Sequence, residues 1–361
     1  MSKTIIHPSI AAGSQFKNRI INGEMRIAQK FAGTVAPVNQ NGLNVYGLDM
    51  WAGQGENADG VFTLQRLTTS PPGEGFNSYL SAVTTTADAS IGAGQRYVFI
   101  NTIENQNLRD FLWGTAKART AVLSFWVNCN QTGTLSGSIR NTDVTRSYVF
   151  TYTINSVSTW EYKSIVIPGD VTGTYPIDTS GTFITFDMGS GSSNRTSAGA
   201  WTAGNYVGAT GSMSLISTLN SALRLTGVQF EFGTAATPFE FRPIQQELIL
   251  CQRYYEKSYA VETAAGTATS TNAFAVTAAQ TGATSVDGSH VFFKVEKRGQ
   301  PLITLYDLAG VAGKLQWYAT SGTATSRNSG SGAVGTKSFS PNQTIAVELL
   351  CYGHWTADAS F

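Results

Sequence analysis

Charged residues are scarce in this chain of 361 residues, of which only 13% are Asp, Glu, Lys or Arg. The formal net charge is +1 at neutral pH, which argues against a broad basic surface for nucleic acid or an anionic membrane. No apolar run is long enough to span a bilayer, and the first residues, MSKTIIHPSIAAG, lack the pattern of a signal peptide. We therefore expect a protein made in a cytoplasm, with no nucleic-acid partner and no membrane insertion.

Cysteine and histidine are also rare. The three cysteines, Cys129, Cys251 and Cys351, are odd in number and far apart, so we expect buried free thiols rather than disulfides or a zinc site. The three histidines lack metal-ligand spacing, and the sequence has no HExxH, GxSxG, phosphate-loop or dinucleotide motif. We expect no enzyme, no catalytic residue, no metal site and no cofactor.

Glycine is abundant, with 37 residues, and between the glycine-rich tracts the sequence alternates as β-strands do. Residues Tyr148–Ile154 place aromatic and aliphatic side chains on one face and smaller ones on the other. The run Ala121–Val127 is apolar on both faces, which predicts a central strand covered on both sides. In two further strand patterns Asp187 and Glu231 fall on the outer face, where we expect solvated carboxylates.

The stretch Ser158–Gly173, STWEYKSIVIPGDVTG, predicts a strand with a defined end. Pro168 lacks the N–H group that a sheet requires, and the Gly-Asp pair that follows suits a tight turn. Trp160 in this stretch and Trp126 in the run Ala121–Val127 are expected in the core or between the sheets, as are Trp317 and Trp355 nearer the C-terminus.

One segment has helical spacing. From Gln245 to Tyr259 there is no Gly or Pro, and Leu248, Cys251 and Tyr255 recur on one side of a helix. We expect this helix to divide the chain into an N-terminal anchoring segment (1–17), a jelly-roll domain (18–243), a connecting helix (244–259) and a C-terminal β domain (260–361). The predicted fold class is all-β: a jelly-roll sandwich, one helix and a smaller β domain.

Seven sequence segments occur in an order that resembles bacteriophage tail-fibre and other virion structural proteins. These segments are Asn18–Gln29, Leu123–Asn128, Arg146–Ile154, Thr159–Tyr175, Ala198–Tyr206, Leu225–Pro243 and Glu247–Ser258. The resemblance implies a jelly roll similar to carbohydrate-binding modules, followed by a helix and a small β domain. It also implies a virion location, other virion proteins as partners and a homotrimer.

Three hypotheses about function follow. The first is a non-enzymatic virion protein, such as a short tail fibre, spike or surface fibre, that attaches to a glycan on the host surface. The second is a decoration or adaptor protein of capsid or tail, in which the jelly roll serves only for packing. The third, which the absence of catalytic motifs disfavours, is a hydrolase that acts on polysaccharide.

Sugar recognition needs flat apolar faces together with amide, hydroxyl or guanidinium groups. Three tryptophans lie in glycine-rich or irregular segments, and the long loop Gly189–Tyr206 adds polar groups and a tyrosine. The candidate glycan-binding residues are Trp51, Trp113, Arg195, Trp201, Asn205 and Tyr206. The alternative is that each tryptophan anchors its own loop, and that Arg195 is simply solvated.

Overall fold

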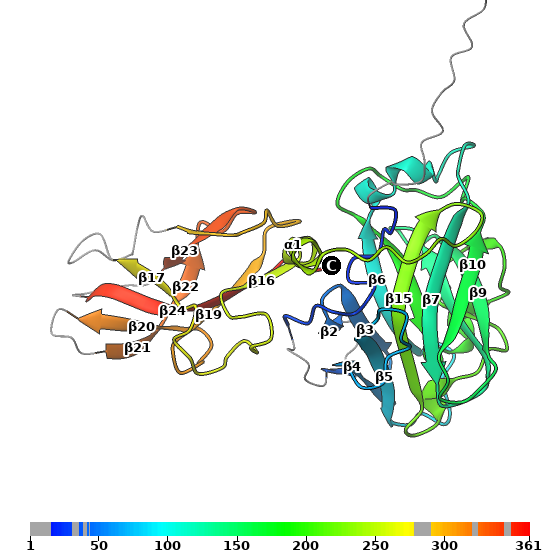
Figure 1. Cartoon of the computed structure of the whole chain (residues 1–361), viewed down its shortest axis with the longest axis horizontal. Coiled ribbons are helices and arrows are strands. Elements are labelled where there is room, and N and C mark those ends of the chain that lie inside the picture. The colour runs from blue at the N-terminus through cyan, green and yellow to red at the C-terminus, as the bar shows by residue number, and fades with distance from the viewer. Residues whose placement is uncertain are drawn as a thin grey trace, which may run out of the picture.

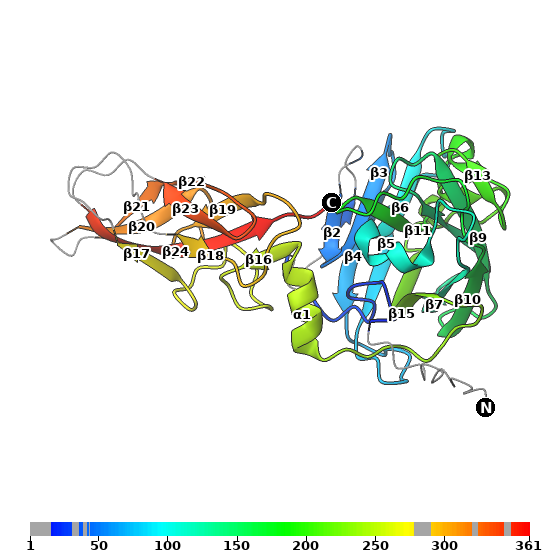
Figure 2. The ribbon, with the colours of Figure 1, turned by 90° about the horizontal axis from the view of Figure 1, so that it is seen from above.

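The computed structural model of the chain describes residues 16–30, 36–38, 42, 44–277, 290–319, 324–342 and 348–361. It contains a large β-sandwich and a smaller C-terminal β region, with the helix α1 (Ile244–Gln252) at their junction (Figures 1 and 2). The predicted all-β fold class is confirmed. The predicted anchoring segment lies outside the described residues, apart from Phe16 and Lys17.

The sandwich consists of two antiparallel sheets that face each other. The first sheet contains, in spatial order, β1 (Ala36–Val38), β4 (Val61–Leu67), β5 (Tyr79–Thr86), β15 (Ala222–Phe232), β7 (Ala121–Cys129) and β10 (Glu161–Ile167). The second contains β13 (Trp201–Ala203), β9 (Arg146–Ile154), β8 (Gly133–Arg140), β11 (Gly181–Asp187), β6 (Arg96–Glu104), β3 (Trp51–Glu56) and β2 (Val45–Leu48).

Short elements connect these strands. They are a parallel pair, β12 (Arg195–Thr196) with β14 (Gly208–Ala209), and the 3₁₀ turns η1 (Asn105–Asn107), η2 (Arg109–Phe111), η3 (Ser192–Asn194) and η4 (Leu215–Ser217). The segment that begins at Asn18 lies beside β15, because Arg19 N–H donates to the Phe230 carbonyl oxygen (2.8 Å). The motif NRIING, Asn18–Gly23, therefore packs on the sandwich.

The sandwich core lies between the two sheets and is built by alternation along each strand. In β9, Tyr148, Phe150, Tyr152 and Ile154 are buried as predicted, and Phe125 of β7 contacts Tyr152 edge-on. Val149 is also buried, so the opposite face of β9 is less polar at that point than the pattern suggests. The strand pattern of the sequence thus reports the core-facing side correctly.

The helix is shorter than the sequence predicts. It ends at Gln252, and Tyr255–Lys257 form β16, which pairs with β24 (Glu348–Asp358). Tyr255 is consequently a strand residue, although its helical spacing placed it on α1. The predicted helix was too long because β24 offers these three residues backbone partners that a longer helix would have excluded.

The C-terminal β region is organised around the long strand β24. That strand pairs with β16, β17 (Phe274–Thr277), β19 (Leu302–Tyr306) and β20 (Lys314–Ala319), and β20 pairs with β21 (Ala324–Asn328). A second small sheet contains β18 (Val291–Phe292), β23 (Ser338–Asn342) and β22 (Gly330–Gly332). Trp317 and Trp355 are buried in this region, as predicted.

The three cysteines are buried and free, as the sequence predicts. Within the described part of the chain, no helix has the length and apolar character needed to span a membrane. The domain boundaries at residues 17, 243 and 259 stay predictions, because buried contacts such as the hydrogen bond from Gln29 Nε2 to the Tyr255 carbonyl oxygen (3.0 Å) connect the sandwich to β16.

Candidate functional site

A groove of about 740 Å³ lies on the outer face of the first sheet, on the side away from the sandwich core. Its lining is dominated by five aromatic side chains, Phe76, Trp126, Tyr162, Phe239 and Phe241. We call this feature the aromatic groove. Polar groups at the groove come from Glu74, Ser124 and Thr237.

The floor of the aromatic groove is formed by β7 and β10. Because side chains alternate across a strand, Phe125 and Val127 of β7 point into the core while Trp126 points outward. Trp126 lies directly opposite Tyr162 in the antiparallel pair, and their ring centroids are 5.5 Å apart. Tyr162 is 46% exposed, so this pair presents a broad aromatic surface to solvent.

The wall of the groove is the segment between β15 and α1, which carries Phe239 and Phe241. These rings contact Phe76 and each other, with centroid separations of 4.9 to 5.1 Å. Phe76 is buried beneath them, whereas Phe241 is 49% exposed. The three rings therefore form a rigid apolar block beside the Trp126–Tyr162 pair.

A β-bulge in β15 shapes the groove beneath this block. The pairing of β15 with β7 shifts register between Thr226 and Gln229, and Gly227 within the shift has φ = +61°. A Cβ atom at this position would lie only 2.6 Å from Cζ of Phe76. Only glycine fits both the left-handed backbone and the close approach of the ring.

Two buried polar residues of β15 hold the wall in place. The Gln229 side chain donates to the Thr237 carbonyl oxygen (3.2 Å) and accepts from Glu240 N–H (2.9 Å). The Glu231 carboxylate accepts from Thr237 N–H (2.9 Å). The prediction that Glu231 is solvated was wrong: the segment that follows β15 folds back and covers this side chain, which is 3% exposed.

A charged turn precedes Tyr162 on β10. The Glu161 carboxylate accepts from Lys163 Nζ (2.7 Å), from the N–H groups of Asn155 and Ser156, and from the Asn155 amide. Burial alone would raise the pKa of Glu161, but these four donors outweigh it and lower the pKa to about 2. The ionised carboxylate thus fixes the turn from which the groove strand begins.

Of the residues predicted from sequence, Trp201 and Trp113 are brought together, but away from the aromatic groove. Their ring centroids are 5.3 Å apart, and Trp201 also contacts Tyr148 at 5.6 Å. The Trp201 indole N–H donates to the Pro168 carbonyl oxygen (2.7 Å) and that of Trp113 to the Arg119 carbonyl oxygen (2.8 Å). Trp113 is buried, and both rings anchor loops, which agrees with the alternative that the sequence left open.

The Pro168-Gly169-Asp170 corner is held from several sides. Burial alone would raise the pKa of Asp170, but hydrogen bonds from Arg146 (3.0 Å), Thr172 and Tyr175 (3.0 Å) lower it. The strand therefore ends at an ionised, fully paired carboxylate. Trp201 on the neighbouring loop completes this corner.

The polar residues of the Gly189–Tyr206 loop have structural contacts. Arg195 is not simply solvated, because its guanidinium donates to the Ser212 carbonyl oxygen (2.9 Å) and pairs with Asp187 (3.2 Å). Asp187 is 1% exposed, so the expectation of a solvated carboxylate was wrong for this residue too. Asn205 accepts from Arg140 (2.7 Å), and Tyr206, which is half-buried, donates its N–H to Ser147 (2.9 Å).

Trp51 is fully buried, which corrects its placement among exposed candidates. Its ring contacts Phe186 at 6.3 Å, and its indole N–H donates to the Asn22 carbonyl oxygen (3.1 Å). The glycine-rich sequence around it forms the hairpin of β2 and β3 rather than a surface loop. Trp51 is therefore a core residue that the NRIING segment covers.

Sequence reasoning missed the aromatic groove because it placed Trp126 and Trp160 in the core or between the sheets. Both are half-buried on the outer face, and Trp160 contacts Tyr79 at 5.3 Å and donates to the Ser70 carbonyl oxygen (3.0 Å). The available signal was Tyr162, an aromatic residue between Glu161 and Lys163. Among the residues that the structure describes, no group of three His, Cys, Asp or Glu side chains is arranged to hold a metal ion.

No protein-family model matches the sequence. No curated protein matches it either. Among solved structures, the chain is similar to the enzymatically active domain of tailspike protein 4 of bacteriophage CBA120, with a TM-score of 0.30 and 15% identity over 60% of this chain and 22% of that chain. The chain thus spans about a fifth of the tailspike domain's length.

Two carbohydrate-binding modules are also similar. The family 11 module from Clostridium thermocellum, in complex with a β-1,3-1,4-mixed-linked tetrasaccharide, has a TM-score of 0.27 and 11% identity over 56% of this chain and 98% of its own. The xylan-binding CBM22-2 domain from Paenibacillus barcinonensis has a TM-score of 0.29 and 14% identity over 51% of this chain and 92% of its own. At these scores the similarities define neither a ligand nor a role for this chain.

Proposed function

We propose that this chain is a glycan-binding protein and that the aromatic groove is its binding site. The observation that carries this proposal is the Trp126–Tyr162 pair, which lies side by side on the outer face of the first sheet. The pair is held by strand register rather than by a loop. Its geometry is therefore formed before any ligand arrives, which reduces the entropic cost of binding.

The chemistry of the groove suits a saccharide. The apolar C–H face of a pyranose packs on aromatic rings, and its hydroxyl groups need hydrogen-bond partners at the margin. Trp126, Tyr162 and Phe241 supply the rings, and the Ser124 hydroxyl and the Glu74 carboxylate supply partners. A groove open along the sheet surface accommodates a chain of sugars rather than a single enclosed one.

We propose that the chain binds glycan without cleaving it. Glycoside hydrolysis usually requires two carboxyl groups on either side of the scissile bond. In the groove lining that the structure describes, Glu74 is the one carboxylate. This arrangement favours a binding site over a hydrolase.

We place the protein in a phage virion, as a short tail fibre, spike or surface fibre that attaches to host-surface polysaccharide. The support is the order of the sequence segments that resemble virion structural proteins. A homotrimer and contacts with other virion proteins are parts of the same proposal. Mass spectrometry of intact particles would test the location, and sedimentation equilibrium would test the trimer.

A capsid or tail adaptor protein is the competing function, because an aromatic groove also suits a segment of another virion protein. A glycan array distinguishes the two. We expect the purified chain to bind at least one bacterial surface glycan and Trp126→Ala to lose that signal. If Trp126→Ala kept full binding, or if the chain bound no glycan, the result would favour the adaptor function for the groove.

A further inference from the structure

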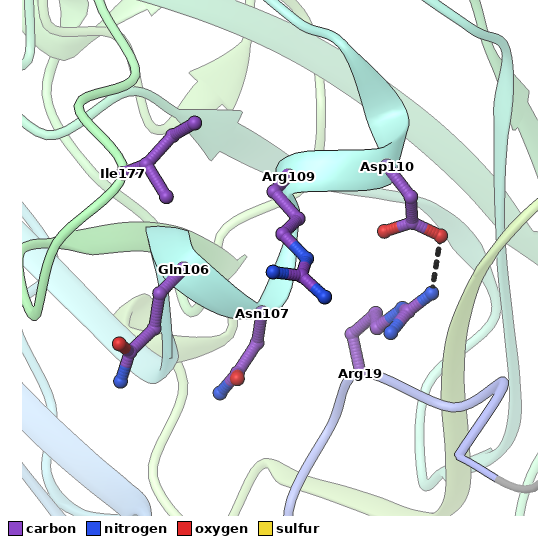
Figure 3. Close-up of a pocket in the computed structure, with 6 residues that line it drawn as sticks. All are labelled: Arg19, Gln106, Asn107, Arg109, Asp110 and Ile177. Carbon is purple, nitrogen blue, oxygen red and sulfur yellow. Dashed lines mark hydrogen bonds and ion pairs between the residues drawn. The ribbon is translucent and has the colours of Figure 1, made fainter.

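A second cavity lies at one end of the sandwich, around the turns η1 and η2. Its volume is about 580 Å³, and its lining consists of Arg19, Gln106, Asn107, Arg109, Asp110 and Ile177 (Figure 3). Two guanidinium groups and a single carboxylate line the cavity, so the lining carries a net charge of +1. We call this cavity the arginine pocket.

Arg19 is held rigidly at one side of the pocket. Its Nη2 pairs with the Asp110 carboxylate at 2.6 Å, and its guanidinium lies 5.6 Å from the centroid of the Phe111 ring. The Arg19 side chain is only 17% exposed, and its buried Nε has no hydrogen-bond partner within the described structure. Burial lowers the pKa of Arg19, and the nearby charges of Asp110 and Glu240 offset only part of this effect. A further negative charge would therefore stabilise the protonated guanidinium.

Arg109 differs from Arg19 because its charge is not neutralised. Its guanidinium lies between Asn107 and Arg19 in Figure 3, and it makes no ion pair or side-chain hydrogen bond with any other residue that the structure describes. The Asn107 amide is also without such a partner in the described part of the chain. The Gln106 amide is fixed by donation to the Glu104 carboxylate. The pocket therefore combines two side chains whose N–H donors are unused, Arg109 and Asn107, with two that are held in place, Arg19 and Gln106.

We propose that the arginine pocket binds a saccharide that carries a carboxylate. The guanidinium of Arg109, with that of Arg19 behind it, suits a planar oxyanion, since arginine donates paired hydrogen bonds to a carboxylate. The Asn107 amide suits neighbouring hydroxyl groups, and the exposed side chain of Ile177 suits the C–H face of the ring. A cavity of this volume is larger than an inorganic anion needs, which favours an anionic sugar over free phosphate.

The arginine pocket goes beyond the aromatic groove, because its chemistry is ionic and its residues are different. Binding in the pocket does not depend on the groove being a glycan site. The variant Trp126→Ala distinguishes the two sites, because it should leave binding in the arginine pocket unchanged.

The experiment is calorimetric titration of the full chain with oligogalacturonate, oligoglucuronate and sialyllactose, each paired with its neutral counterpart, and with inorganic phosphate. At least one acidic sugar should bind, more weakly at high salt, and its neutral counterpart should bind about tenfold less tightly or not at all. Arg109→Gln should weaken the acidic sugar by about tenfold, the effect of losing a charged hydrogen bond. The matched control Arg119→Gln removes an exposed charge that lies beside the Phe232 ring and outside the pocket, and it should have no effect.

Four results would overturn the assignment. These are absence of binding to every acidic sugar, equal binding of a neutral counterpart, unchanged affinity in Arg109→Gln, or phosphate binding as tight as that of the best acidic sugar. Both arginine variants change exposed side chains, so each should retain the wild-type melting temperature. Chemical shifts of the Asn107 side-chain amide on titration provide a second readout, and a shift confined to other residues would also contradict the proposal.

Discussion

Trp126 and Tyr162 are direct cross-strand partners on β7 and β10, with ring centroids 5.5 Å apart, on the face of the sheet that points away from the core. Aromatic pairs at such positions usually stabilise a sheet by contact with each other. Here the phenol ring of Tyr162 remains nearly half exposed, and the groove beside the pair is open. The pair therefore stabilises the sheet and provides a surface for a ligand.

Trp201→Ala tests whether the long loop is a binding surface or an anchor. We expect a loss of about 3 kcal/mol in the free energy of unfolding, as for large aromatic truncations in cores, because the Trp113 contact and the Pro168 hydrogen bond disappear. Glycan binding should persist. Denaturant unfolding and the glycan array measure stability and binding on one sample. Loss of glycan binding at unchanged stability would instead support the Gly189–Tyr206 loop as the glycan site.

Gly227→Ala tests the bulge beneath the aromatic groove. We expect a loss of about 1–3 kcal/mol, because the left-handed backbone is strained for alanine and the new Cβ would meet the Phe76 ring. Gly299→Ala is the matched control, since no atom lies within 4 Å of a Cβ there. Equal melting temperatures for the two variants would show that the bulge does not constrain Phe76.

The sequence predicts the sandwich well because strand alternation reports core burial directly, as in Tyr148–Ile154. It misleads at Trp126, since the outer face of β7 is also apolar and looks like a second buried face. What makes that face a groove is the wall around Phe239 and Phe241, which returns over the sheet from the end of β15. Such a contact between distant segments leaves no periodic signal, and neither does the burial of Glu231 beneath it.

Glu161→Gln tests the charged turn before the groove strand. The folded pKa of about 2 lies below the usual 4.5, so the carboxylate contributes stability above pH 4.5 that disappears as the pH falls toward 2. The difference in unfolding free energy between wild type and variant should therefore shrink across this range. Lys163→Met removes one donor to Glu161, so the pH range over which this difference shrinks should become narrower. A difference in unfolding free energy that is constant with pH would refute the role of the ionised carboxylate.

Arg253→Ala tests the connection between the sandwich and the C-terminal β region. Arg253 follows α1 and pairs with Glu104 of β6 through two hydrogen bonds of 2.7 and 3.0 Å, and the Glu104 side chain is fully buried. Removing the counter-charge of that buried carboxylate, to which only the neutral Gln106 amide would still donate, should cost about 3 kcal/mol in unfolding free energy. The double variant Arg253→Met with Glu104→Gln should recover part of the loss, and a single variant as stable as wild type would argue against a fixed junction.

The most direct test of the aromatic groove is the dissociation constant of an array-selected glycan, measured by titration for wild type, Trp126→Ala and Trp201→Ala. We predict that Trp126→Ala weakens binding by at least about tenfold, or about 1.4 kcal/mol, because the sugar loses its largest stacking surface. Trp201→Ala should keep the wild-type constant despite its lower stability. The reverse result, with binding lost in Trp201→Ala and unchanged in Trp126→Ala, would contradict the groove as the glycan site.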